Sequence, residues 1–320
     1  MKEYGGYIEL ESFKGNLFHD NAIPLNCGRN ALAYICEAKN IKKLYIPYFL
    51  CSSIKNTCEK INVEYDYYHI NGDFKPIIDF DINNNDYIYI VNYYGQLDNS
   101  YINELKRQYK NIIVDNAQSY FQMPIHDVDT LYTCRKYFGV SDGAFLYTDK
   151  FLDHELEIDE SLNRMQFILG RFERSANEFY SQYVENNSLF KNESIKQMSK
   201  LTENLLRAED YEYVGLRRQL NFECLDLELN DINKLNVKCT FGPYMYPLYV
   251  SNGDRIRKYL QNKKIYIPVL WPNVLDDCDE NTIEYQYALN ILPIPVDQRY
   301  GIDDMRYLIG EIKKAISTIE

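Results

Sequence analysis

A chain of 320 residues can bury a large hydrophobic core, and we expect one large domain and a smaller second one. Its 47 Asp and Glu residues outnumber 35 Lys and Arg residues, which gives a formal net charge of −12 and argues against nucleic acid as a partner, because phosphate backbones recruit basic surfaces. No apolar run approaches the roughly 20 residues of a membrane span, so we expect no membrane partner either.

The first 150 residues alternate short apolar runs with polar stretches of helical character. We predict strands over 44–47, 87–91, 112–114 and 144–147, and helices over 52–60, over 100–109 and from about Asn30. Strands that alternate with helices predict an α/β fold, a doubly wound, mostly parallel sheet covered on both faces. Ligands of such sheets bind beyond the carboxyl ends of the strands, where Asn92, Tyr93 and Asp115 are expected.

The second half of the chain changes character twice. Residues 151–220 contain no proline and only two glycines, which predicts helices, and we assign residues 1–220 to the large domain. From residue 221 we predict a small α+β domain over 221–320. Its predicted elements are strands over 245–250 and 265–267, an extended piece over 292–295, and helices over 254–262 and 302–319.

The cysteines and histidines argue for a cytoplasmic protein without a metal site. The eight cysteines include no CxxC pair, and the first residues contain no apolar signal segment, so we expect free thiols in a reducing compartment. The four histidines lie far apart and in no ligand spacing, so we expect no bound metal.

Asp115 and Lys136 suggest one particular chemistry. Asp115 ends the apolar run 111–115, and Lys136 lies in a turn that continues to Asp142-Gly143. A lysine can hold an aldehyde cofactor as a Schiff base, and a carboxylate at a strand end can keep the cofactor's pyridine nitrogen protonated. Taken singly, Lys136 would be a surface lysine, Asp115 a helix cap, and Thr133 an ordinary strand residue.

Gly28 supplies a third element of such a site. It precedes a predicted helix, where exposed backbone amides and the helix dipole favour a phosphate group. A glycine before a helix is usually only a turn, so this motif depends on the others. Together Gly28, Asp115, Thr133 and Lys136 would supply a phosphate cup, a carboxylate, a hydroxyl and a Schiff-base lysine.

In this order the motifs resemble those of the DegT-type sugar aminotransferases, a branch of the fold type I pyridoxal-phosphate (PLP) enzymes. Residues 28–32 resemble the family's Gly-Thr-x-Ala-Leu loop, with Arg29 in place of threonine. Residues 115–118 resemble its Asp-Ala-Ala-Gln segment, and the turn from Lys136 to Gly143 resembles its lysine turn. Weaker matches lie at 46–51, which echoes a Val-Pro strand end, at 217–222, at 246–248 and at 292–294.

The resemblance implies a fold type I PLP-dependent transferase-like fold with PLP as the cofactor. Lys136 and Asp115 would be catalytic, with Asp115 pairing with the pyridine nitrogen and Gln118 approaching the cofactor ring. The implied cofactor-binding residues are Gly28, Arg29, Asn30, Cys51, Asp115, Gln118, Thr133 and Lys136. The implied reaction moves an amino group from an amino acid, such as glutamate, to a nucleotide-linked keto sugar of surface-polysaccharide or natural-product synthesis. A homodimer with shared active sites is also implied.

The chain departs from the family pattern in two places. The family's Gly-x-Asn-x-Arg segment, whose asparagine reaches the cofactor phosphate of the partner subunit, has no match between residues 150 and 215. Cys51 stands where many members have an aromatic residue that stacks on the cofactor ring, and either Tyr48 or Phe49 could take that role. A non-catalytic homologue with a binding or regulatory role therefore stays open as an alternative. A second alternative is a PLP-dependent sugar dehydratase, but dehydratases of this type replace the lysine with histidine.

Overall fold

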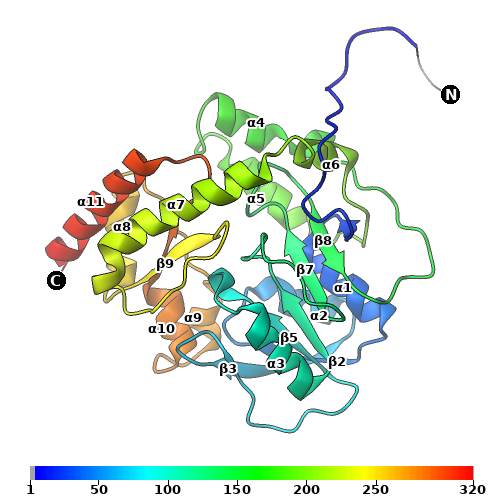
Figure 1. Ribbon diagram of the computed structural model, residues 1–320, viewed down its shortest axis with the longest axis horizontal. Coiled ribbons are helices and arrows are strands. Elements are labelled where there is room, and N and C mark those ends of the chain that lie inside the picture. The colour runs from blue at the N-terminus through cyan, green and yellow to red at the C-terminus, as the bar shows by residue number, and fades with distance from the viewer. Residues whose placement is uncertain (1–3, 320) are drawn as a thin grey trace.

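The computed structural model describes residues 4–319, and within them eight strands form one sheet in the order β1-β8-β7-β6-β5-β2-β3-β4 (Figure 1). The strands of this sheet are β1 (Ile23–Leu25), β2 (Lys43–Pro47), β3 (Glu64–Ile70), β4 (Pro76–Ile77), β5 (Tyr87–Val91), β6 (Ile112–Asp115), β7 (Asp129–Thr133) and β8 (Ala144–Tyr147). The helices that follow them are α1 (Gly28–Ala38), α2 (Ser52–Lys60), α3 (Asn99–Tyr109), α4 (Gln166–Glu173), α5 (Tyr180–Leu189), α6 (Lys200–Leu206) and α7 (Tyr211–Leu229).

The sheet is mostly parallel, as predicted. Strands β7, β6, β5, β2 and β3 run in one direction, and β4 and β8 are antiparallel to their neighbours β3 and β7. Because β1 is antiparallel to β8, it runs in the same direction as β7. The carboxyl ends of β1, β2, β5, β6 and β7 therefore lie along one edge of the sheet.

The central strands form because their residues are apolar at consecutive positions rather than at alternate ones. All four residues of β6 are buried, and so are the last four residues of β5. A sheet covered by helices on both faces needs this pattern, since neither side of a central strand meets water. The sheet and its covering helices share one large hydrophobic core.

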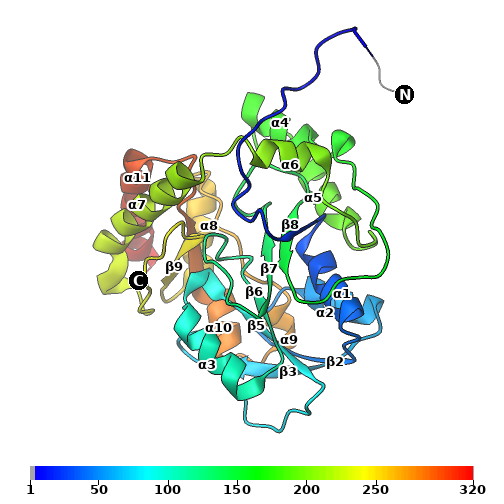
Figure 2. The same cartoon turned by 45° about the vertical axis from the view of Figure 1, so that its right-hand side comes forward.

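A second hydrophobic cluster lies beside the sheet (Figures 1 and 2). It gathers side chains from the second half of α7 and from the C-terminal elements of the chain. These are β9 (Met245–Tyr249), α8 (Gly253–Asn262), β10 (Ile291–Pro295) and α11 (Ile302–Ile319), with α9 (Val274–Asp277) and α10 (Ile283–Asn290) between them. Strands β9 and β10 pair antiparallel in a small sheet of their own. The division of the chain at residue 220 stays a prediction, and α7 crosses that point without a break.

The strand predicted over 265–267 is wrong. Ile265 and Ile267 are buried in the second cluster, but the backbone from 265 to 267 joins no strand of the described chain. The backbone N–H of Ile265 instead bonds to the carbonyl oxygen of Leu260 at the end of α8. Alternating burial at this point comes from packing of an extended loop, not from a β-ladder.

Residues 151–220 are only partly helical. Between α5 and α6 the chain runs extended beside β1, where Gln197 forms isolated bridges with Leu25 and Ile158. Residues 11–15 of the N-terminal segment contact α6 and its C-terminal end through bonds to Asn204 and Arg207. None of the helices within residues 4–319 has both the length and the hydropathy that a membrane crossing requires.

Candidate active site

Residues from four distant parts of the chain meet at the carboxyl edge of the sheet. Asp115 is the last residue of β6, and Thr133 is the last residue of β7. Gly28 follows the end of β1, and Cys51 follows the end of β2. The strand order places Asp115 and Thr133 on neighbouring strands, with Gly28 and Cys51 on either side of them. The structure thus gathers the predicted site residues at one edge, as parallel strands require.

Asp115 is nearly buried and accepts two hydrogen bonds. Its Oδ1 accepts from the backbone N–H of Ala117 at 2.8 Å, and its Oδ2 accepts from the hydroxyl of Tyr89 at 2.7 Å. Burial, reinforced by the charge of Asp115, raises the pKa of Tyr89 well above its usual value, so Tyr89 stays a neutral donor. Tyr89 could not be predicted as a site residue, because nothing in the run 87–91 distinguishes it from an ordinary buried strand residue.

Gln118 reaches across to the loop after β5. Its Oε1 accepts a 2.8 Å hydrogen bond from the backbone N–H of Tyr94, whose φ of +52° lies in the left-handed region. The adjacent Gly95 also has a positive φ, of +73°, and a side chain there would meet the hydroxyl of Ser119. Gln118 is 2% exposed and therefore fixes a tight turn beside Asp115 from a buried position.

Lys136 lies on an exposed part of the turn after β7. Its Nζ is 5.5 Å from the centre of the Tyr244 ring, a cation–π distance. The backbone of the turn is held at the next residue, because the carbonyl oxygen of Tyr137 accepts from Arg218 Nη2 at 3.2 Å and from Gln298 Nε2 at 2.8 Å. The position of Lys136 thus depends on contacts from the C-terminal third of the chain.

Arg218 is the largest buried polar side chain in this region, with 1% of its surface exposed. Its guanidinium donates to the carbonyl oxygens of Tyr137, Pro243 and Tyr244 and to Oε1 of Gln298. Burial lowers the pKa of Arg218, and its Cζ atom lies 4.5 Å from the centre of the Tyr137 ring. The sequence of residues 217–222 indicates only a match to a helix motif, so this role of Arg218 was not predicted.

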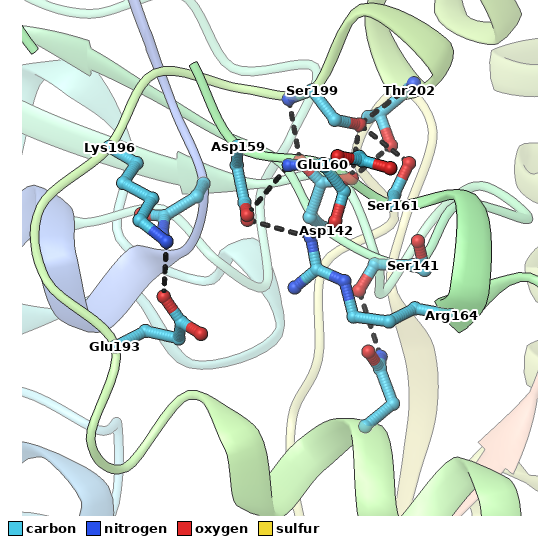
Figure 3. A network of polar contacts seen from close by, with 12 residues as sticks. Ser141, Asp142, Asp159, Glu160, Ser161, Arg164, Glu193, Lys196, Ser199 and Thr202 are labelled. Atoms are coloured by element: carbon cyan, nitrogen blue, oxygen red, sulfur yellow. Dashed lines mark hydrogen bonds and ion pairs between the residues drawn. The ribbon is translucent and has the colours of Figure 1, made fainter. Parts of the chain in front are cut away.

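Asp142 anchors the far end of the lysine turn (Figure 3). Its carboxylate accepts from the backbone N–H and the hydroxyl of Ser199, both at 2.8 Å, and from the hydroxyl of Thr202. Burial raises the pKa of Asp142, and these hydrogen bonds act in the opposite direction. Gly143 follows with a φ of +110°, and its N–H bonds to the carbonyl oxygen of Asn26 at 2.7 Å. Asp142 therefore ties the turn to α6, and Gly143 ties it to the loop before α1.

The N-terminus of α1 faces the same edge of the sheet. A Cβ added at Gly28 would come within 3.9 Å of Leu131 Cδ1, and Leu131 is the strand partner of Asp115. The side chain of Asn30 bonds to other parts of the protein: its Nδ2 donates to Asn26 Oδ1 at 2.9 Å and to the carbonyl oxygen of Ser194 at 2.7 Å. Arg29 extends from the first turn of the helix and bonds to the carbonyl oxygen of Asn187.

The candidate ring-stacking residues already have other partners. Phe49 is fully buried and packs on Tyr93 and Trp271, and Tyr48 stacks on Tyr67 at 4.5 Å between ring centres. Cys51 is half-buried at the start of α2, with its Sγ 2.7 Å from the hydroxyl of Ser53.

Comparison with known proteins identifies the fold. No family model and no curated protein sequence matches the chain. Three similar solved structures are NtdA from Bacillus subtilis with bound cofactor PMP, DesV from S. venezuelae in complex with a ketimine intermediate, and a DegT DnrJ EryC1 StrS aminotransferase from Brucella abortus. Their identities to this chain are 14%, 13% and 13%, and their TM-scores are 0.64, 0.65 and 0.59. Each alignment covers 92% of this chain, and 73%, 84% and 85% of the respective neighbour. The chain has the fold of these proteins, so the predicted fold type I α/β architecture is confirmed.

Proposed function

We propose that this protein is a PLP-dependent aminotransferase of the DegT type. The single observation that carries the proposal is that the carboxyl edge of a sheet with this fold gathers Gly28, Asp115 and Lys136 from separate elements. Among the solved structures with the same fold, NtdA has bound PMP and DesV is in complex with a ketimine intermediate. The lysine at the expected place argues for a transferase rather than a dehydratase.

The residues present fit the cofactor. No side-chain capping hydrogen bond closes the start of α1, and the backbone N–H groups of Arg29 and Asn30 lie against the Cys27 thiol, a weak acceptor that a phosphate oxygen would replace. The two oxygens of Asp115 accept one hydrogen bond each, which leaves the carboxylate able to accept a third from a pyridinium N–H. Lys136 is exposed and free to bond covalently to an aldehyde.

PLP supplies, when bound, an aldehyde that captures amines and a ring that delocalises the charge of a deprotonated carbon. In the proposed mechanism Lys136 Nζ takes the proton from the α-carbon of the amino donor. Asp115 holds the proton on the ring nitrogen, and Tyr89 holds Asp115 in position through its 2.7 Å hydrogen bond. Gln118 and Thr133 line the same edge and would orient the ring.

The substrates follow from the resemblance and form the less direct part of the proposal. We infer that the donor is an amino acid such as glutamate and that the acceptor is a nucleotide-linked keto sugar. We also infer a cytoplasmic homodimer. Exposed apolar side chains on α4 and α5 support a second copy, since Leu169, Phe172 and Tyr180 are 58%, 88% and 63% exposed.

Absorbance spectroscopy of purified protein mixed with PLP tests the proposal. We expect a visible Schiff-base band that disappears when glutamate is added, and borohydride reduction should attach the cofactor covalently to a peptide that contains Lys136. Lys136→Ala should abolish the band, the covalent label and transamination. Lys150→Ala, at an exposed lysine away from the site, is the matched control and should change none of them. A Lys136→Ala protein that keeps transaminase activity would refute the assignment, and a wild-type protein that never binds PLP would favour the non-catalytic alternative.

A further inference from the structure

Two arginines from distant segments meet beside the start of α1. Arg29 lies in the first turn of α1, and Arg135 immediately precedes Lys136. Arg29 Nη1 donates to the backbone oxygen of Asn187 at 3.3 Å, and Arg135 Nη2 donates to the side-chain oxygen of the same residue. Asn187 lies near the end of α5, so three separate elements converge at this point.

Neither arginine has an acidic partner among the described residues. Asp142 lies within electrostatic reach of Arg135, but its carboxylate accepts from Ser199 and Thr202. Burial lowers the pKa of Arg135, and the nearby charge of Arg29 acts in the same direction. Two guanidinium groups that share only a neutral asparagine leave a local excess of positive charge, which an anion would offset.

Arg164 provides an instructive contrast in the same neighbourhood. Its guanidinium lies 5.2 Å from the centre of the Phe190 ring, and that of Arg135 lies 4.9 Å from the same ring. Arg164 is neutralised by a 2.7 Å ion pair with Asp159 (Figure 3). Arg135 has no such ion pair within residues 4–319. The Phe190 ring thus contacts one arginine whose charge is paired with a carboxylate and one arginine whose charge is not.

The uncompensated charge adjoins the helix end proposed to bind phosphate. The thiol of Cys27, the residue before α1, lies within electrostatic reach of both Arg29 and Arg135. Arginine binds phosphate oxygens with two parallel N–H groups, and a helix N-terminus contributes further amide donors. Both features therefore favour the same ligand chemistry, a phosphate monoester dianion.

We propose that Arg29 and Arg135 together bind the phosphate group of the cofactor, so that one chain supplies phosphate contacts in place of the partner-subunit asparagine that this chain lacks a match for. This inference rests on the proposed function, and it explains why a chain without the Gly-x-Asn-x-Arg segment can retain the cofactor. Asn187 holds the two guanidinium groups together and would remain their bridge when the phosphate is bound.

Titrations with PLP and with pyridoxal, which lacks the phosphate, test the inference. Arg135→Gln and Arg29→Gln should each weaken PLP binding roughly tenfold to a hundredfold, the usual worth of a charge-assisted hydrogen bond, and should change pyridoxal binding less than about twofold. Arg164→Gln is the matched control and should leave the preference for PLP over pyridoxal unchanged. Retention of wild-type PLP affinity by both Arg135→Gln and Arg29→Gln would overturn the inference while leaving the proposed function intact.

Two further measurements separate the possible failures. If Arg135→Gln also loses pyridoxal binding, the variant is misfolded. The PLP and pyridoxal affinities of Arg29→Gln then decide whether the inference holds. If PLP affinity is unchanged in both variants but KM rises for a nucleotide-linked acceptor, the arginines bind the substrate's phosphate and the inference is wrong. If the wild type binds neither PLP nor pyridoxal, the proposed function fails. Inorganic phosphate then decides whether the arginine pair is an anion site, because it should raise the Tm of the wild type and of Arg164→Gln but not of Arg135→Gln.

Discussion

Tyr89 and Asp115 lie on neighbouring strands, and the hydroxyl of one donates a 2.7 Å hydrogen bond to the carboxylate of the other. Tyr89 is fully buried and Asp115 is 9% exposed, so water cannot easily replace this bond. Asp115 ends β6 at the carboxyl edge of the sheet in the proposed site, and the contribution of its hydrogen bond to Tyr89 can be measured directly.

We expect Tyr89→Phe to slow transamination roughly tenfold, because a hydrogen bond to a charged group is worth about 1.5–3 kcal/mol and the ring itself is retained. Asp115→Ala should cost orders of magnitude more. Steady-state kcat with a saturating amino donor measures both effects. Tyr65→Phe is the control, since its hydroxyl bonds to Glu59 on the surface, and a rate loss as large as that of Tyr89→Phe would disprove a specific role for Tyr89.

Arg218→Ala should lower the free energy of unfolding by about 3–4 kcal/mol, because it leaves a cavity and strips donors from three buried carbonyl oxygens. Urea denaturation measures the change. Arg217→Ala is the control on the same helix, where the side chain is only half-buried and packs over Tyr213, and its effect should stay within about 0.5 kcal/mol. Equal losses for the two variants would contradict the bracing role of Arg218.

Gly143→Ala should destabilise the protein by about 1–3 kcal/mol, because a φ of +110° strains any residue with a Cβ. The added carbon would also lie 3.0 Å from Thr202 Cγ2 and 3.1 Å from Cys134 Sγ. Gly139→Ala, in the same turn, meets only Ile168 at an ordinary 3.6 Å and should change Tm little. Thermal unfolding of the two variants side by side distinguishes backbone strain from a general sensitivity of the turn.

His19 should make the fold sensitive to acid. Burial lowers its pKa from 6.5 to about 4, although the carbonyl oxygen of Tyr120 partly opposes this by accepting from Nε2 at 2.8 Å. The unfolded chain binds the proton first, so stability is fully present above pH 6.5 and is lost as the pH falls toward 4. The loss should reach about 3 kcal/mol.

Urea denaturation at several pH values measures this contribution. His19→Gln keeps a neutral donor and should flatten the dependence between pH 6.5 and 4, whereas His154→Gln, at an exposed position, should leave it unchanged. An unaltered slope in His19→Gln would show that other groups cause the acid sensitivity.

The sequence predicted those elements whose apolar pattern is local. Helix α2 at 52–60 and helix α11 at 302–319 match their predicted bounds, because both carry an amphipathic pattern with clear ends. Strand β7 was missed since it begins with the buried Asp129, whose charge is compensated by a 2.7 Å ion pair with Lys39. Lys39 and Asp129 are far apart in the chain, so the sequence of the strand does not show that this ion pair forms.

The same distinction holds for the site. Gly28, Asp115 and Lys136 lie in short motifs that are informative only in combination, and the structure places them at one edge of the sheet. The roles of Tyr89 and Arg218 arise only from hydrogen bonds to other elements. Asp142 was predicted to lie in the lysine turn, but its hydrogen bonds to Ser199 and Thr202 depend on how α6 packs.

The contact of Gln298 and Arg218 with the Tyr137 carbonyl has a consequence for synthesis of the chain. A nascent polypeptide that ends before Gln298 already contains all the proposed cofactor contacts, yet the turn that carries Lys136 lacks one of its two braces. The turn that carries Lys136 would therefore gain its second brace only after Gln298 has left the ribosome. A fragment of residues 1–220 would contain the proposed cofactor contacts but would lack the bond from Gln298 that helps to hold this turn.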